Sequence, residues 1–170
     1  MDHNFDLIVI GAGPGGYTAA EHAARQGLRV AVIERHKLGG CCINYGCIPT
    51  KAFIHASSLY SSLKNCGQFG LVAGETGFDF PAVCAYKDDA IARFRESVGQ
   101  EFDQLGVVFI QGTAQIVREG VVSVTAAQGG KEVFRARHIL IATGARAYKP
   151  PIPGIDLPGV VTSWEILGTP

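Results

Sequence analysis

The chain has 170 residues, enough for one domain with a hydrophobic core, and its 47% hydrophobic and 18% charged residues are typical of a globular protein. Fifteen basic and fifteen acidic residues give a net charge of zero, which argues against nucleic acid or an anionic membrane as the main partner. Five cysteines at uneven spacing do not form a secreted disulfide framework, and the apolar run at 7–10 is too short for a signal peptide or a membrane span. We therefore expect a cytoplasmic protein with reduced thiols.

The first 34 residues predict a β-α-β unit. Residues 5–10 (FDLIVI) form a continuous β-favouring run, which is typical of a strand buried on both faces. A glycine-rich turn at 11–16 leads into an alanine-rich helix at 17–26, and 29–34 (RVAVIE) reads as a second buried strand. A crossover of this length implies parallel strands.

The following segment, 39–64, combines a cysteine-containing loop with a helix, and 65–80 has no clear period and is expected to be a loop. Apolar residues recur at a period close to 3.6 over 81–105, which predicts a helix, and 107–111 predicts a third buried strand.

Alternating runs between 113 and 136, separated by glycine-containing turns, predict a small antiparallel meander. The run at 138–142 (HILIA) is expected to be a further strand, and the four prolines between 150 and 158 exclude a continuous helix after it.

The turn at 11–16 matches a G-x-G-x-x-G pattern through Gly11, Gly13 and Gly16. Its place between a strand and a helix, with Glu34 ending the next strand, is the context that indicates dinucleotide binding. Open N–H groups at the helix N-terminus favour a pyrophosphate there. A carboxylate at Glu34 accepts hydrogen bonds from ribose hydroxyls and repels a 2′-phosphate, which favours the adenosine of FAD or NAD over NADP.

The segment 39–51 reads GGCCINYGCIPTK, with four residues between Cys42 and Cys47. Their Cα atoms would lie about 8–9 Å apart on an ideal helix, whereas a disulfide needs less than about 7 Å. A bridge here requires an interrupted helix, and Gly46 permits one. Three interpretations stand: a redox pair beside a flavin, a metal site, or unpaired structural thiols. The metal site would use three cysteines with one of two histidines: Cys41, Cys42, Cys47, and His36 or His55.

These motifs, with ATGARAYKPPIPG at 142–154, resemble the pyridine-nucleotide-disulfide oxidoreductases over nearly the whole chain. The resemblance implies that Cys42 and Cys47 are the catalytic pair, with Cys47 nearest the flavin and Cys42 meeting the substrate. It also implies that Lys51 lies beside the flavin ring, where its positive charge tunes the ring. The residues it implies for cofactor binding are Gly11, Gly13, Pro14, Gly15, Gly16, Glu34, Arg35, Gly40, Cys41, Lys51, Ala114, Ala142, Thr143 and Gly144. No resident metal is expected.

One departure from the family pattern is Cys41, where a threonine is usual. A thiol binds phosphate more weakly than a hydroxyl does, and it adds a third sulfur beside the pair. Arg146 either approaches the flavin side or is a solvated loop charge.

The resemblance implies an α/β Rossmann-like FAD/NAD(P)-binding fold, with a central parallel sheet, helices and an antiparallel meander. We expect an FAD-binding domain over 1–150 and a connector over 151–170 toward an NAD(P)-binding domain that this sequence does not contain. The complete enzyme would move electrons between NAD(P)H, FAD and a disulfide or dithiol substrate as a homodimer. A dihydrolipoamide dehydrogenase is favoured, with a glutathione or mercuric reductase, or a non-catalytic FAD-binding module, as alternatives.

Overall fold

The computed structural model describes residues 3–168. Contacts between Cα atoms divide the chain into two compact units, and each is described by itself. The first unit comprises Met1–Cys42 and Phe94–Arg146, and the second comprises Ile43–Arg93 and Ala147–Pro170. The division into an FAD-binding domain over 1–150 and a connector over 151–170 stays a prediction.

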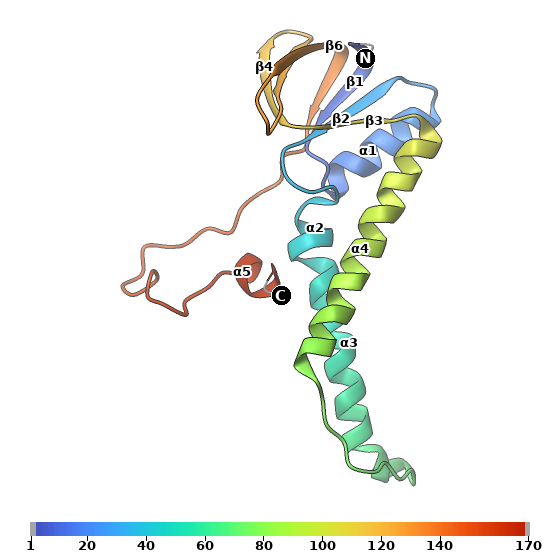
Figure 1. Cartoon of the computed structure of the whole chain (residues 1–170), viewed down its shortest axis with the longest axis vertical. Helices are drawn as coiled ribbons and strands as arrows, with labels where there is room; N and C mark the ends of the chain where they lie inside the picture. Colours follow the sequence, from blue (N-terminus) through green and yellow to red (C-terminus); the bar gives the residue numbers. More distant parts are fainter. Residues whose placement is uncertain (1–2, 169–170) are drawn as a thin grey trace. The chain divides into compact units, whose positions relative to one another are not determined.

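The first unit is built on one six-stranded sheet in the order β3-β2-β1-β6-β5-β4 (Figure 1). The neighbours β3-β2-β1-β6 run parallel, and β6-β5-β4 run antiparallel. This confirms the predicted α/β fold with a parallel core and an antiparallel meander. The strands are β1 (Asn4–Ile10), β2 (Val30–Glu34), β3 (Val108–Gln111), β4 (Thr113–Arg118), β5 (Val121–Thr125) and β6 (Lys131–Ile141).

The helix α1 (Pro14–Arg25) crosses from β1 to β2 and packs against both, as the β-α-β prediction requires. It begins three residues before the predicted start at 17. Proline occupies its first turn, where the missing N–H costs no hydrogen bond and the fixed φ suits the helix. The glycines that suggested a turn are therefore partly helical.

The core of the first unit lies between the parallel strands and the meander. Ile8, Ala31 and Ile33 on β1 and β2 pack with Val122 on β5 and Phe134 on β6, and all five are at most 1% exposed. The strand β4 contacts β2 although the two are not neighbours in the sheet. The sheet therefore curls so that its antiparallel part covers one face of its parallel part.

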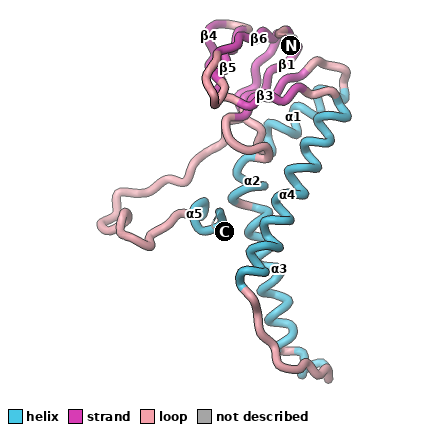
Figure 2. The backbone as a smooth tube through the Cα atoms, viewed as in Figure 1, coloured by secondary structure: helices cyan, strands magenta, loops and turns pink. Residues whose placement is uncertain are grey.

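The prediction of two separate strands around 132–136 and 138–142 was wrong, because β6 runs unbroken over Lys131–Ile141 (Figure 2). Its first half pairs antiparallel with β5, and its second half pairs parallel with β1. Arg137 lies between the two predicted strands. Its side chain is 81% exposed, so the strand accommodates it without interruption.

The second unit is organised around α3 (Cys47–Lys64) and the first part of α4 (Phe80–Leu105), which continues into the first unit. Aromatic pairs join α3 to α4 and to the segment before it: Phe53 with Phe80, His55 with Tyr86, and Tyr60 with Phe78. The connecting segment, predicted as a loop, contains a single 3₁₀ turn, η1 (Cys66–Phe69).

A short helix, α5 (Ser163–Gly168), follows the proline-rich segment. Glu165 accepts a hydrogen bond from the backbone N–H of Thr162, which caps the helix and lowers the pKa of that carboxyl. Trp164 stacks on Tyr45 of α2 (Gly40–Tyr45) with ring centroids 5.3 Å apart.

A buried lysine on α4 leads to a stability prediction. The Lys87 side chain is 1% exposed, with its ammonium 3.2 Å from Asp88 Oδ1 and 5.8 Å from the centroid of the Phe53 ring on α3. We expect Lys87→Ala to lower the free energy of unfolding by about 2–4 kcal/mol, since it removes a buried stem and a desolvated cation–π contact.

The matched control is Lys64→Ala, at the exposed end of α3, where the ammonium lies 5.2 Å from the centroid of Tyr60. An exposed cation–π contact contributes about 0.5–1 kcal/mol. Chemical denaturation of both variants measures the difference, and equal losses would show that the burial of Lys87 contributes nothing.

Candidate cofactor and redox site

The glycine-rich turn between β1 and α1 leaves the N-terminus of the helix open. Gly11 donates its N–H to Ile33 O at 2.8 Å, which ties the turn to β2, and Gly16 N–H bonds Gly13 O at 2.8 Å. No side chain caps α1, and no acidic residue lies in its first turn. Backbone N–H groups and the positive end of the helix dipole therefore favour an anion at this position.

Two close backbone approaches explain why glycine is needed here. A Cβ placed on Gly16 would lie 1.9 Å from Gly11 O, and one placed on Gly40 would lie 2.5 Å from the Gly13 Cα. The Gly39 N–H also donates to Ala12 O at 2.8 Å. The structure thus brings Gly40 beside Gly13, and these are two of the residues predicted to line a pyrophosphate.

The carboxylate of Glu34 is held in place by two backbone N–H groups. Oε2 accepts from Ala12 N at 2.8 Å, and Oε1 accepts from His36 N at 2.8 Å. Sequence reasoning assigned Glu34 only to a ribose. The structure adds that Glu34 also fastens the turn at Ala12 to the end of β2. Each oxygen keeps a further lone pair for a hydroxyl donor.

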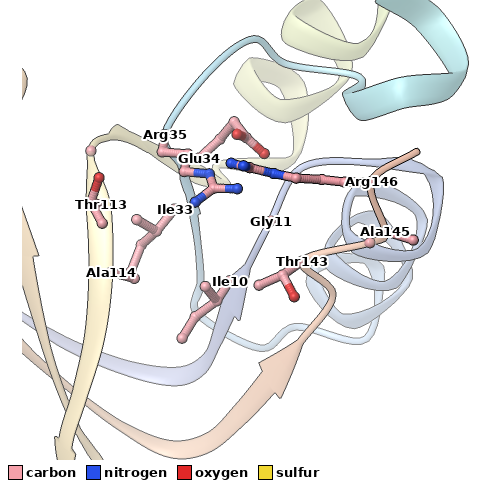
Figure 3. Close-up of a pocket in the computed structure, with 12 residues that line it drawn as sticks. Ile10, Gly11, Ile33, Glu34, Arg35, Thr113, Ala114, Thr143, Ala145 and Arg146 are labelled. Atoms are coloured by element: carbon pink, nitrogen blue, oxygen red, sulfur yellow. The ribbon is translucent and has the colours of Figure 1, made fainter. Parts of the chain in front are cut away.

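A cavity of about 380 Å³ opens at the carboxyl ends of β1, β2 and β6 (Figure 3). This is within the range of small-molecule sites, and the carboxyl edge of a parallel sheet is where such folds bind their ligands. Six predicted cofactor residues line it: Gly11, Glu34, Arg35, Ala114, Thr143 and Gly144. Arg35 and Arg146 extend toward each other across it (Figure 3).

Sequence reasoning missed several residues of this cavity. Ile10, Ile33, Gly112, Thr113 and Ala145 also line it. Arg146 had two interpretations, and the structure places it at the cavity. Ala142, which was predicted to bind the cofactor, is not among the lining residues. Its N–H donates to Ile10 O at 2.8 Å and continues the pairing of β6 with β1.

The cysteine segment is interrupted as predicted. α2 ends at Tyr45, Gly46 has φ −141° and ψ −101°, and α3 begins at Cys47. Cys41 is exposed and Cys42 is partly buried on α2, in the first unit. Cys47 belongs to the second unit.

Cys47 is a free, exposed thiol at the N-terminus of α3. Lys51 lies four residues further on, which is one helical turn, and is also exposed.

No three His, Cys, Asp or Glu side chains within residues 3–168 gather in an arrangement suited to a metal ion. In the same range, no helix combines the length and the apolar character needed to cross a membrane.

Comparison with known proteins decides the family. The family model described as pyridine nucleotide-disulphide oxidoreductase matches residues 5–167. The chain belongs to the pyridine nucleotide-disulphide oxidoreductase family. Its fold and its identity with family members both point to the FAD-binding portion of these flavoproteins.

Relatives of known name are similar over almost all of this chain. It is 36% identical over 172 residues to dihydrolipoyl dehydrogenase of Acholeplasma laidlawii, covering 98% of this chain and 50% of that protein. It is 40% identical over 167 residues to dihydrolipoyl dehydrogenase of Chlorobaculum parvum, covering 96% of this chain and 35% of that protein.

Among solved structures, a Cu(II) complex of the HOCl-induced flavoprotein disulfide reductase RclA from Escherichia coli superposes with a TM-score of 0.80 at 29% identity. The match covers 99% of this chain and 35% of that chain. The chain therefore spans between about a third and half the length of these relatives.

Proposed function

We propose that the chain binds FAD at the carboxyl edge of the parallel sheet, and that Cys42 and Cys47 form the redox pair of a dihydrolipoamide dehydrogenase-type enzyme. The observation that carries the proposal is the convergence of six of the predicted cofactor residues on one cavity, beside an open helix N-terminus. The 36–40% identity with dihydrolipoyl dehydrogenases supports this member of the family. A cytoplasmic location and a homodimeric complete enzyme stay predictions.

The residues of the first unit fit an adenosine diphosphate group. The backbones of Gly13 and Gly40 pack directly against each other, because a Cβ on Gly40 would meet Gly13. Glu34 is oriented by its two N–H donors and can accept from ribose hydroxyls. Ala114, Thr143 and Gly144 offer small or short side chains around the cavity. FAD, when bound, supplies the ring that exchanges an electron pair with the thiols.

The chemistry assigned to the cysteines is thiol–disulfide exchange. A Cys42 thiolate attacks one sulfur of a substrate disulfide, forms a mixed disulfide and releases the first substrate thiol. Cys47 then attacks the Cys42 sulfur, releases the second thiol and leaves an oxidised pair. Two electrons pass to the substrate, and two protons end on its sulfurs. NAD(P)H would restore the dithiol in the complete enzyme, and a dithiol substrate would run the sequence in reverse.

The sequence predicts two alternative functions for the complete protein. A glutathione or mercuric reductase would share this portion of the fold and differ in its substrate. A non-catalytic FAD-binding module would need neither the second cysteine nor Lys51, and the presence of both favours the redox function.

The absorption spectrum of the purified chain with added FAD tests the proposal. We expect binding to perturb the visible flavin bands, and dithiothreitol to raise a long-wavelength band from a thiolate over the flavin ring. Cys47→Ser should abolish that band. Cys42→Ser should produce it without reductant, since Cys47 can then no longer form the disulfide with Cys42.

Cys66→Ser is the matched control, because this thiol lies in η1, away from the motif, and should leave the band unchanged. A chain that ignores added FAD would refute the FAD site. A band that survives in Cys47→Ser, or that Cys41→Ser removes instead, would refute the assignment of the pair.

A further inference from the structure

A second cavity, of about 490 Å³, lies in the first unit at the amino-terminal ends of β1 and β2, away from the cofactor cavity. Four of the chain's nine arginines line it: Arg29, Arg118, Arg135 and Arg137. They come from the residue before β2, the end of β4 and the middle of β6. The positions are far apart in sequence, so only the sheet register brings them together.

The register places three of these arginines on one face of the sheet. Arg118 pairs with Val121 across β4 and β5, and Val121 pairs with Arg135 across β5 and β6. Residues directly opposite each other in a ladder share a face, so Arg118 and Arg135 flank Val121 on the same side. Arg137 follows two residues later on β6, on the same face.

The charge in this cavity is not balanced. Its only carboxylates among the lining residues are Asp6 and Glu119. Asp6 is already engaged, since it accepts from the Arg29 backbone N at 3.0 Å and lies 3.7 Å from Arg137 Nη1. No ion pair of Arg118 or Arg135 is found among the described residues. The residues that line the cavity thus include four arginines and two carboxylates, in a chain whose net charge is zero.

The scaffold around the arginines is fixed by backbone hydrogen bonds. Arg135 N–H donates to His3 O at 2.7 Å, and Ala136 N–H donates to Gly120 O at 3.0 Å. The Arg29 guanidinium lies over the Phe5 ring, 5.8 Å from its centroid, which limits its orientations. A ligand would therefore meet a backbone that is already in place and an Arg29 side chain of limited freedom.

We propose that this basic cavity binds a polyphosphate group, such as the di- or triphosphate of a nucleotide or inorganic polyphosphate. Guanidinium groups form paired, charge-assisted hydrogen bonds with phosphate oxygens, and several arginines match a ligand with several adjacent charges. The cavity is larger than the one assigned to FAD, so it accommodates more than a single phosphate. The inference is independent of the FAD site.

Calorimetric titration of the 170-residue chain with inorganic tripolyphosphate tests this site. We expect saturable 1:1 binding that weakens at least tenfold between 50 and 200 mM salt, as expected for several ionic contacts. The double variant Arg118→Ala/Arg135→Ala should weaken binding at least tenfold. Lysine at both positions should weaken it less, because the charges remain while the paired hydrogen bonds are lost.

Two control variants separate this cavity from other basic groups. Arg93→Ala removes an exposed arginine paired with Asp89 on α4, and Arg146→Ala removes one from the cofactor cavity. Neither should alter the affinity, and saturating FAD should not compete. Absent binding, full binding by the double alanine variant with its circular dichroism intact, or competition by FAD would each overturn the proposal.

Discussion

Replacing Gly16 with alanine is expected to lower the free energy of unfolding by about 3–5 kcal/mol or to prevent folding. The added Cβ would lie 1.9 Å from Gly11 O and 2.9 Å from Gly11 C, both backbone atoms that cannot rotate away. Gly11 is itself held, through its N–H bond to Ile33 O. Relief would require α1 to move off β1, which would expose the Val9 and Ala20 side chains that are buried there.

Gly15→Ala is the matched control one residue earlier. Nothing lies within 4 Å of a Cβ at Gly15, and its φ is not positive. Alanine there should be neutral or stabilising by about 0.5–1 kcal/mol, since it restricts the unfolded chain and favours the helix. Guanidinium denaturation followed by circular dichroism compares the two. Equal stability of both variants would show that the turn opens freely, and the close packing of α1 on the turn would then have no energetic weight.

The parts of the fold that could be predicted from sequence are those that local pattern determines. Residues 30–33 of β2 and residues 8–9 of β1 are buried and read as apolar runs. The dinucleotide-binding pattern requires the glycines, the crossover helix and Glu34 at fixed spacings in the sequence. The structure places them at one edge of the sheet. The interruption at Gly46 also followed from local geometry, since an ideal helix separates Cys42 and Cys47 too far for a bridge.

The parts that could not be predicted depend on the register between distant strands. The alternating run that ends at 136 and the apolar run at 138–142 predicted two strands, whereas β6 continues through the exposed Arg137 between them. No local sequence pattern predicts the curl of the sheet that brings β4 into contact with β2. The same is true of the basic cavity, where Arg29 and Arg135 lie 106 positions apart in sequence and meet only through β1.

The engagement of Glu34 with Ala12 was also beyond sequence reasoning, and it leads to the second large effect. Glu34→Ala is expected to lower the free energy of unfolding by about 2–4 kcal/mol, because hydrogen bonds to a charged group contribute about 1.5–3 kcal/mol each and one of the two donors is buried. Ala12 is fully buried, so its N–H cannot donate a hydrogen bond to water once the carboxylate is removed. The His36 N–H is exposed and can donate to water instead, so the loss of its bond to Glu34 lowers the free energy of unfolding only slightly.

Glu34→Gln distinguishes the structural role of this side chain from its proposed role toward FAD. The amide oxygen can still accept from Ala12 N, so stability should fall by about 1–2 kcal/mol only, reflecting the lost charge. The affinity for FAD should fall in both variants, by roughly 10- to 100-fold, because an amide accepts ribose hydroxyls at one atom where a carboxylate accepts at two.

Glu75→Ala, in an exposed loop, should change neither the stability nor the affinity for FAD. Denaturation curves and flavin titrations provide the two measurements. If the alanine variant is as stable as the glutamine variant, the Ala12 N–H has found another acceptor. If both variants bind FAD with undiminished affinity, Glu34 does not belong to the proposed adenosine site, although its role in the turn stands.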